Sequence, residues 1–198
     1  MKHEPSALWQ NFRSAFADEI RGASDATLHL AWKTPSNRTG LYGVEIIPRV
    51  ATRLGFTLEP ELLRVDWAML ERSSSHENIP LIFVESENAA ATAGREMRKL
   101  CAVSCPVAAL ITVVEWNPEV FPKSRWRHEL MAEWERIIKA QYEVWPREGI
   151  IGIIVGEWGP NNVLRFYSLA YSTTADILRR EEQLMERAIA IPDASTAA

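Results

Sequence analysis

The stretch from Ile79 to Glu87 reads Ile-Pro-Leu-Ile-Phe-Val-Glu-Ser-Glu, a hydrophobic run that ends in two acidic residues. A short apolar run bounded by polar residues is typical of a buried strand. The Ala-rich segment Ala89–Val103 follows with helical character, and Asn88 is placed to cap that helix. Ala108–Trp116 has the composition of a second buried strand. A strand, a crossover helix and a strand predict a parallel pair in an α/β sheet.

The residues on the amino-terminal side of this unit predict helices and one more strand. Apolar side chains at three- and four-residue spacing predict a helix over Ala7–Ile20, and Thr34–Gly40 has the composition of a loop. Val44–Leu54 is expected to be a helix that ends at Gly55. Leu62–Leu70 is short and apolar with one acid inside it, which favours a strand.

The residues on the carboxyl-terminal side predict a long amphipathic helix over Arg125–Val144 and a hairpin of two strands, Ile150–Trp158 and Val163–Tyr171. Thr174–Ile191 is rich in charged, helix-favouring residues and is expected to be a helix. We interpret the chain as one domain over 1–198, with an amino-terminal helix and loop in 1–40, a core in 41–116, a helix, hairpin and helix in 117–191 and a tail in 192–198. The expected fold class is α/β, a mixed central sheet flanked by helices.

Composition excludes several classes of protein. The chain has 198 residues, of which 47% are hydrophobic and 24% charged, values that rule out a disordered or fibrous chain. The net charge of −4 argues against a protein that coats nucleic acid, although not against a local basic channel. Because apolar runs fall short of the about 20 residues that a membrane span needs, and no secretory leader is visible, we expect a soluble, cytoplasmic protein without a membrane partner. Cys101 and Cys105 are expected to be reduced and buried.

Three acidic residues are the best candidates for chemistry. Asp66 lies in an apolar segment, and Glu85 and Glu87 close the next strand with side chains on the same face. If the two strands are adjacent and antiparallel, the three carboxylates meet at one end of the sheet. Clustered carboxylates repel one another unless a cation or a proton compensates, and hard oxygen ligands suit Mg²⁺ or Mn²⁺. The alternative is structural, because Glu85 and Glu87 would also complement the positive end of the following helix.

This order of elements resembles the core of the PD-(D/E)XK nuclease superfamily, which has the restriction-endonuclease-like fold. In that pattern Asp66 corresponds to the motif aspartate, Glu85 to the second acid and Glu87 to the lysine position, over about residues 42–116. The resemblance implies a metal-dependent hydrolysis of phosphodiester bonds, with Mg²⁺ (or Mn²⁺) held by Asp66, Glu85 and Glu87. It also implies that Glu45, on the preceding helix, is a fourth acid of the site. The implied partner is nucleic acid, DNA in preference to RNA, and a restriction-type enzyme would act as a homodimer.

Glu87 in place of the motif lysine is the main departure from the family pattern, and it leaves three readings open. Some family members keep activity with a glutamate there, others carry the lysine on the following helix, where Lys99 and Arg95 are available as a transition-state cation, and others have lost catalysis. A function of another class also stays open. The eight tryptophans could form a surface through which a non-catalytic module on this scaffold binds a protein or a small ligand.

Overall fold

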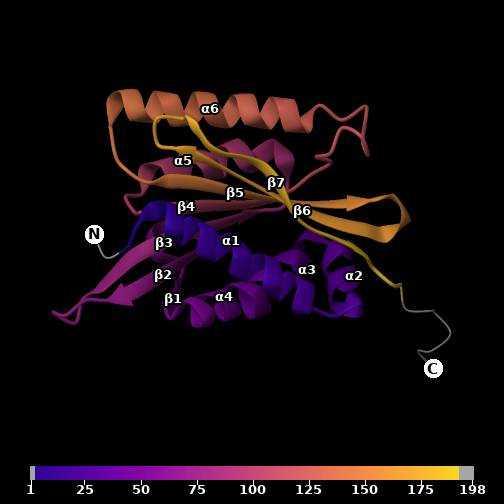
Figure 1. Ribbon diagram of the computed structural model, residues 1–198, viewed down its shortest axis with the longest axis horizontal. Helices are drawn as coiled ribbons and strands as arrows, with labels where there is room; N and C mark the ends of the chain where they lie inside the picture. Colours follow the sequence, from indigo (N-terminus) through magenta and orange to yellow (C-terminus); the bar gives the residue numbers. More distant parts are fainter. Residues whose placement is uncertain (1–2, 192–198) are drawn as a thin grey trace.

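The computed structural model describes residues 3–191, and the expected tail 192–198 lies outside the described residues. The chain forms an α/β protein in which helices flank one mixed sheet (Figure 1). The longer helices are α1 (Pro5–Gly22), α2 (Asp25–Lys33), α3 (Pro35–Gly40), α4 (Ile47–Leu54), α5 (Ala93–Ala102) and α6 (Trp126–Val144), with a π-helical segment η1 (Leu41–Ile46) between α3 and α4. Short 3₁₀ turns are η2 (Leu62–Arg64), η3 (Ala90–Thr92) and η4 (Pro160–Asn162).

The sheet has seven strands in the order in which they occur along the chain. They are β1 (Thr57–Pro60), β2 (Trp67–Arg72), β3 (Asn78–Glu87), β4 (Val107–Val113), β5 (Ile150–Gly159), β6 (Val163–Ser172) and β7 (Ile177–Ala188). The two central pairs, β3 with β4 and β4 with β5, are parallel, and all other pairs are antiparallel. The expected parallel crossover through α5 and the expected hairpin of β5 and β6 are therefore confirmed.

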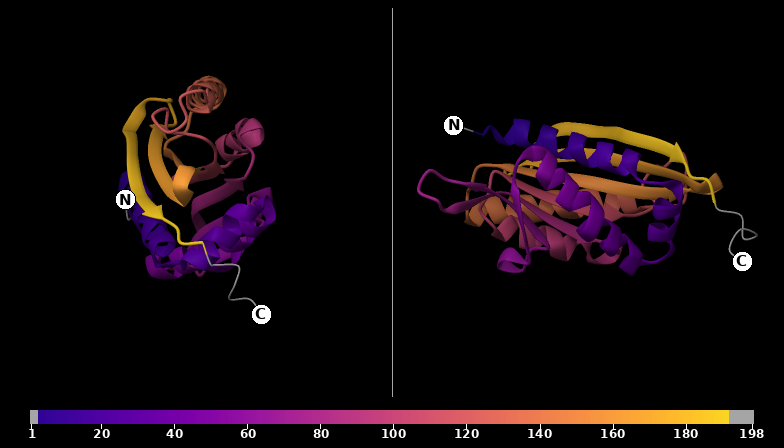
Figure 2. Two further views of the ribbon diagram at one scale, coloured as in Figure 1. Left: turned by 90° about the vertical axis from the view of Figure 1, so that its right-hand side faces the viewer. Right: turned by 90° about the horizontal axis from the view of Figure 1, so that it is seen from below.

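Helices cover both faces of the sheet, and each interface buries its own hydrophobic core (Figures 1 and 2). On one face α1 and η1 pack aromatic residues such as Phe12, Phe16 and Tyr42 against the strands, and α4 packs aliphatic residues such as Val50. On the other face α5 and α6 pack residues such as Met97 and Trp134. Parallel strands are buried on both faces, which explains the continuous apolar runs of β3, β4 and β5.

Most tryptophans belong to these two cores and do not form a binding surface. Trp9, Trp116 and Trp134 are each at most 1% exposed, and Trp116 stacks on Trp134. Trp67 lies in the core on the opposite face of the sheet from Trp116. Trp145 is 69% exposed. The fully buried rings are therefore not accessible to a partner at the surface, whereas Trp32, Trp126 and Trp158 are partly buried.

Two predictions of local structure were wrong. Thr34–Gly40 is not a loop, because the hydroxyl of Thr34 accepts a hydrogen bond from the Asn37 N–H and Pro35 fills the first helical position of α3. Leu62–Leu70 is not one strand either. It begins with a 3₁₀ turn, and β2 starts only at Trp67, so that Asp66 precedes the strand instead of lying inside it.

The expected helix over Thr174–Ile191 was also wrong, since this segment contains the edge strand β7. Its composition favours a helix, but pairing with β6 overrides that local preference. Consecutive acids are held on opposite faces, as a strand requires: Glu182 binds Arg13 of α1, while Glu181 binds Arg127 of α6. A helix would not direct adjacent side chains to two layers in this way.

Candidate functional site

A constrained turn places Asp66 at the start of β2. Glu61, Leu63 and Arg64 all have positive φ angles, between 54° and 66°, although none is glycine. The N–H of Glu61 donates to the carbonyl of Asp66 at 3.0 Å, which closes the turn. Such backbone conformations cost of order 1–3 kcal/mol each and persist only where the surrounding structure enforces them. The turn therefore fixes the position of Asp66 at a cost in stability.

Asp66 is joined directly to the end of β3. Its Oδ2 accepts a hydrogen bond from the backbone N–H of Ser86 at 2.9 Å. Because N–H and C=O of one residue in an extended strand point to the same side, the carbonyl of Ser86 also lies on the side of Asp66. The pairing of β2 with β3 stops at Val84, so the last residues of β3, up to Glu87, extend past β2.

Glu85 is the buried acid of the site, with 1% of its surface exposed. The Nζ of Lys99, from α5, lies 2.6 Å from Oε1 of Glu85 and 2.5 Å from Oε2 of Glu96. Asp66, Glu85, Glu96 and Lys99 thus form one cluster of charged groups, which we call the acid–lysine cluster. It is formed by the start of β2, the end of β3 and one face of α5.

Burial dominates the electrostatics of this cluster. It raises the pKa of Glu85 to about 8, although the hydrogen bond from Lys99 opposes the rise and the charge of Asp66 adds to it. Burial also raises the pKa of Asp66, opposed by the Ser86 N–H. Burial alone would lower the pKa of Lys99, but its contacts with Glu85 and Glu96 raise it above the ordinary value. A desolvated acid beside a second acid and a permanent ammonium is an arrangement typical of functional sites.

The structure places the other expected site residues outside this cluster. Glu87 bends toward the backbone, where its Oε1 accepts from the Ala89 N–H at 2.8 Å. Glu45 lies on η1, in the helical layer on the other face of the sheet, and pairs with Arg49 at 3.2 Å. Arg95 is largely exposed at the start of α5 and lies 3.8 Å from Glu96.

Sequence reasoning missed Glu96, which the structure shows as the second partner of Lys99. The signal was present, because residues three apart share one face of a helix. Asn88 was expected to cap the following helix, but its side chain instead accepts from Arg38 and donates to Thr39. The helix α5 starts later, at Ala93, after a 3₁₀ turn.

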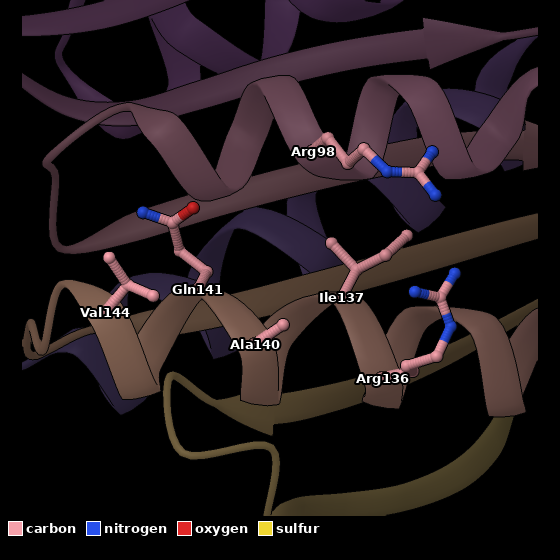
Figure 3. Close-up of a pocket in the computed structure, with 6 residues that line it drawn as sticks. All are labelled: Arg98, Arg136, Ile137, Ala140, Gln141 and Val144. Atoms are coloured by element: carbon pink, nitrogen blue, oxygen red, sulfur yellow. The ribbon is translucent and has the colours of Figure 1, made fainter.

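A groove between α5 and α6 carries two arginines. It has a volume of about 290 Å³. Arg98 extends into it from α5, and Arg136 lies on α6 together with the apolar residues Ile137 and Val144 (Figure 3). Arg98 pairs with Glu133 at 3.3 Å. Arg98 is also the neighbour of Lys99 on α5, so the groove and the acid–lysine cluster lie on different sides of the same helix.

Within residues 3–191, no group of three or more histidine, cysteine, aspartate or glutamate side chains has the arrangement of a metal site. Cys101 and Cys105 are free thiols, as expected; Cys101 is buried, whereas Cys105 is only partly buried. Burial raises the pKa of each thiol to about 11. A thiol with a raised pKa is a poor nucleophile and a poor metal ligand at neutral pH. In the same part of the chain, no helix has the length and apolar character to cross a bilayer.

Comparisons with known proteins give little beyond this geometry. No protein-family model matches the chain, and no curated protein matches it. Among solved structures, the central domain of yeast acetyl-CoA carboxylase is similar with 9% sequence identity and a TM-score of 0.36. That similarity covers 70% of this chain and 26% of the carboxylase chain, so the chain spans about a quarter of that protein's length. A likeness of this extent supports no inference about function.

Proposed function

We propose that this chain is a metal-dependent phosphodiester hydrolase with a restriction-endonuclease-like core. The observation that supports it best is the ion pair of Lys99 with Glu85 beside Asp66. The sequence has an acid, Glu87, at the position where the family motif has its lysine. An ammonium from the following helix reaches the same second acid, as in family members whose lysine has moved to that helix.

The residues of the cluster fit a divalent cation. Mg²⁺ keeps several waters and is bound in enzymes through one or two carboxylates together with substrate phosphates. Asp66 and Glu85 provide two carboxylates, and the carbonyl of Ser86 lies on the same side as a third oxygen. Thr112 adds a buried hydroxyl without a hydrogen-bond partner, next to Glu87 in the sheet register. The raised pKa of both acids fits a site where a cation offsets their charge.

Each residue has a defined task in this proposal. A divalent ion held by Asp66 and Glu85 would supply an activated water and neutralise charge on the phosphate. Lys99 carries a permanent positive charge and would donate from Nζ to a phosphate oxygen. Glu96 holds the ammonium of Lys99 in place through the second ion pair. The rigid turn before Asp66 keeps its carboxylate fixed relative to β3.

The substrate proposed is nucleic acid, with DNA preferred. Arg98 and Arg136, in the groove on the other side of α5, would contact backbone phosphates at a distance from the cluster. The basic residues at the start of α6 are a second candidate for this contact. Arg125 pairs with Glu129 and Arg127 with Glu181, as Arg98 pairs with Glu133.

The test is the binding of Mn²⁺ by isothermal titration, together with cleavage of a labelled DNA in the presence of Mg²⁺. Asp66→Asn keeps an acceptor for the Ser86 N–H but removes the charge, and it should lose both metal binding and cleavage. Glu45→Gln, on the other face of the sheet, is the matched control and should keep both. Equal Mn²⁺ binding by the wild type and Asp66→Asn would contradict the proposal.

A further inference from the structure

A second unusual group lies on the opposite side of β3 from Glu85. Arg38, on α3, is buried with 8% of its surface exposed. Its Nε donates to Oδ1 of Asn88 at 2.8 Å, and its Nη1 reaches the carbonyl of Trp32 at 3.4 Å. Its guanidinium also lies over the ring of Trp32, 5.9 Å from the centroid. All these partners are neutral.

The charge of Arg38 therefore has no counter-ion in the described part of the chain. A comparison with Arg13 makes the point, because Arg13 is equally buried, at 5%, but lies 2.6 Å from the carboxylate of Glu182. Buried charges in proteins are normally paired, and an arginine does not lose its proton. Burial lowers the pKa of Arg38, and Tyr42 is the one neighbouring ionisable group that acts on it.

Tyr42 provides a second unexplained group at the same place. It follows Arg38 by one helical turn and is fully buried, and its hydroxyl has no hydrogen-bond partner. Burial raises the pKa of this phenol, so it stays neutral and cannot compensate Arg38. The segment that carries it, η1, is a π-helix, a local distortion that occurs frequently at functional sites. Leaving a buried hydroxyl without a partner costs about 1–3 kcal/mol.

We propose that Arg38 and Tyr42 form a binding site for a phosphate group. The guanidinium supplies the positive charge and Nη2, which donates to no acceptor among residues 3–191, while the phenol supplies a neutral O–H donor. Asn88 fixes Nε and so sets the direction of the remaining donors. The site lies where β3 ends, and ligands of α/β proteins bind beyond the carboxyl ends of parallel strands.

This site is separate from the acid–lysine cluster. The helices that carry Arg38 and Tyr42 cover the face of the sheet opposite α5, which carries Lys99. Phosphate binding at Arg38 therefore does not depend on the hydrolase proposal. The phosphate group could belong to a free anion or to a nucleic-acid backbone, and the experiment distinguishes these sources.

The experiment measures the dissociation constants of inorganic phosphate and of a short single-stranded DNA by titration calorimetry, at constant ionic strength with EDTA present. The variants are Arg38→Gln and Tyr42→Phe, and Arg53→Gln removes an exposed arginine as the control. We expect at least tenfold weaker binding of one of the two probes in Arg38→Gln and several-fold weaker binding in Tyr42→Phe, with Arg53→Gln unchanged.

Tyr42→Phe removes a hydroxyl that has no partner, so this variant should fold even if Arg38→Gln does not. Binding of inorganic phosphate that both substitutions weaken supports a free-anion site, and binding of DNA alone supports a backbone site. The proposal is overturned if neither probe binds, or if a probe binds and neither substitution changes its dissociation constant. Asp66→Asn should leave this binding intact, so failure here and failure of the hydrolase proposal are distinguishable.

Discussion

Replacing Glu85 by glutamine tests the electrostatic reasoning about the acid–lysine cluster. The substitution keeps the shape of the side chain and an oxygen for Lys99, which lies 2.6 Å from Oε1, but it removes the ionisable carboxyl. Lys99 retains Glu96 as a partner at 2.5 Å. The substitution therefore changes the pH dependence of stability with little change in packing.

The magnitude follows from the pKa of Glu85, which burial raises from 4.5 to about 8. The folded state holds the proton of Glu85 more tightly than the unfolded state does. The contribution of Glu85 to the free energy of unfolding is therefore fully present below pH 4.5. It is lost as the pH rises through 8. At about 1.4 kcal/mol per pKa unit, that interval corresponds to a loss of roughly 5 kcal/mol. The glutamine variant lacks this loss. Its free energy of unfolding should therefore change less with pH than that of the wild type, and should be higher than the wild-type value at pH 9.

The assay is urea denaturation of both proteins at several pH values between 5 and 9, with the free energy of unfolding as the readout. Glu87→Gln is the matched control, because it makes the same substitution on the same strand but does not touch Lys99. We expect the control to follow the wild-type profile. Parallel profiles for the wild type and Glu85→Gln would refute the raised pKa.

Four further predictions concern the free energy of unfolding and use the same denaturation assay. Gly152→Ala should cost roughly 1–3 kcal/mol or more, because a Cβ there would lie 2.3 Å from the ring of buried Trp9. Gly40→Ala, in a helix with open space around it, should instead be neutral or stabilise by about 0.5–1 kcal/mol, and a loss would contradict α3. Glu157→Ala should cost about 3–5 kcal/mol, because its carboxylate is fully buried and accepts from two backbone N–H groups after β4. Asp66→Asn should change stability by less than about 1 kcal/mol, because the amide oxygen can still accept from the strand; a loss of several kcal/mol would make Asp66 a structural acid.

Local sequence was sufficient to predict a strand where a single hydrophobic pattern determined both its conformation and its burial. The apolar runs of β3, β4 and β5 are buried on both faces, and strands of that kind are recognisable without knowledge of their neighbours. The parallel crossover followed from the helix between two such runs, and Asp66 and Glu85 were brought together because β2 pairs with β3 in the expected antiparallel sense.

Tertiary structure decided what local preference could not. The segment Ile177–Ala188 has the composition of a helix and becomes a strand, because pairing with β6 and ion pairs to two helical layers outweigh that preference. Lys99 pairs with Glu85 because α5 packs over the end of β3. Glu87 does not join them, because its carboxylate accepts a hydrogen bond from the backbone. By itself, the sequence determined the central strands and the two acids; which cation meets them, and which arginine is buried without a counter-ion, depend on contacts between residues far apart in the chain.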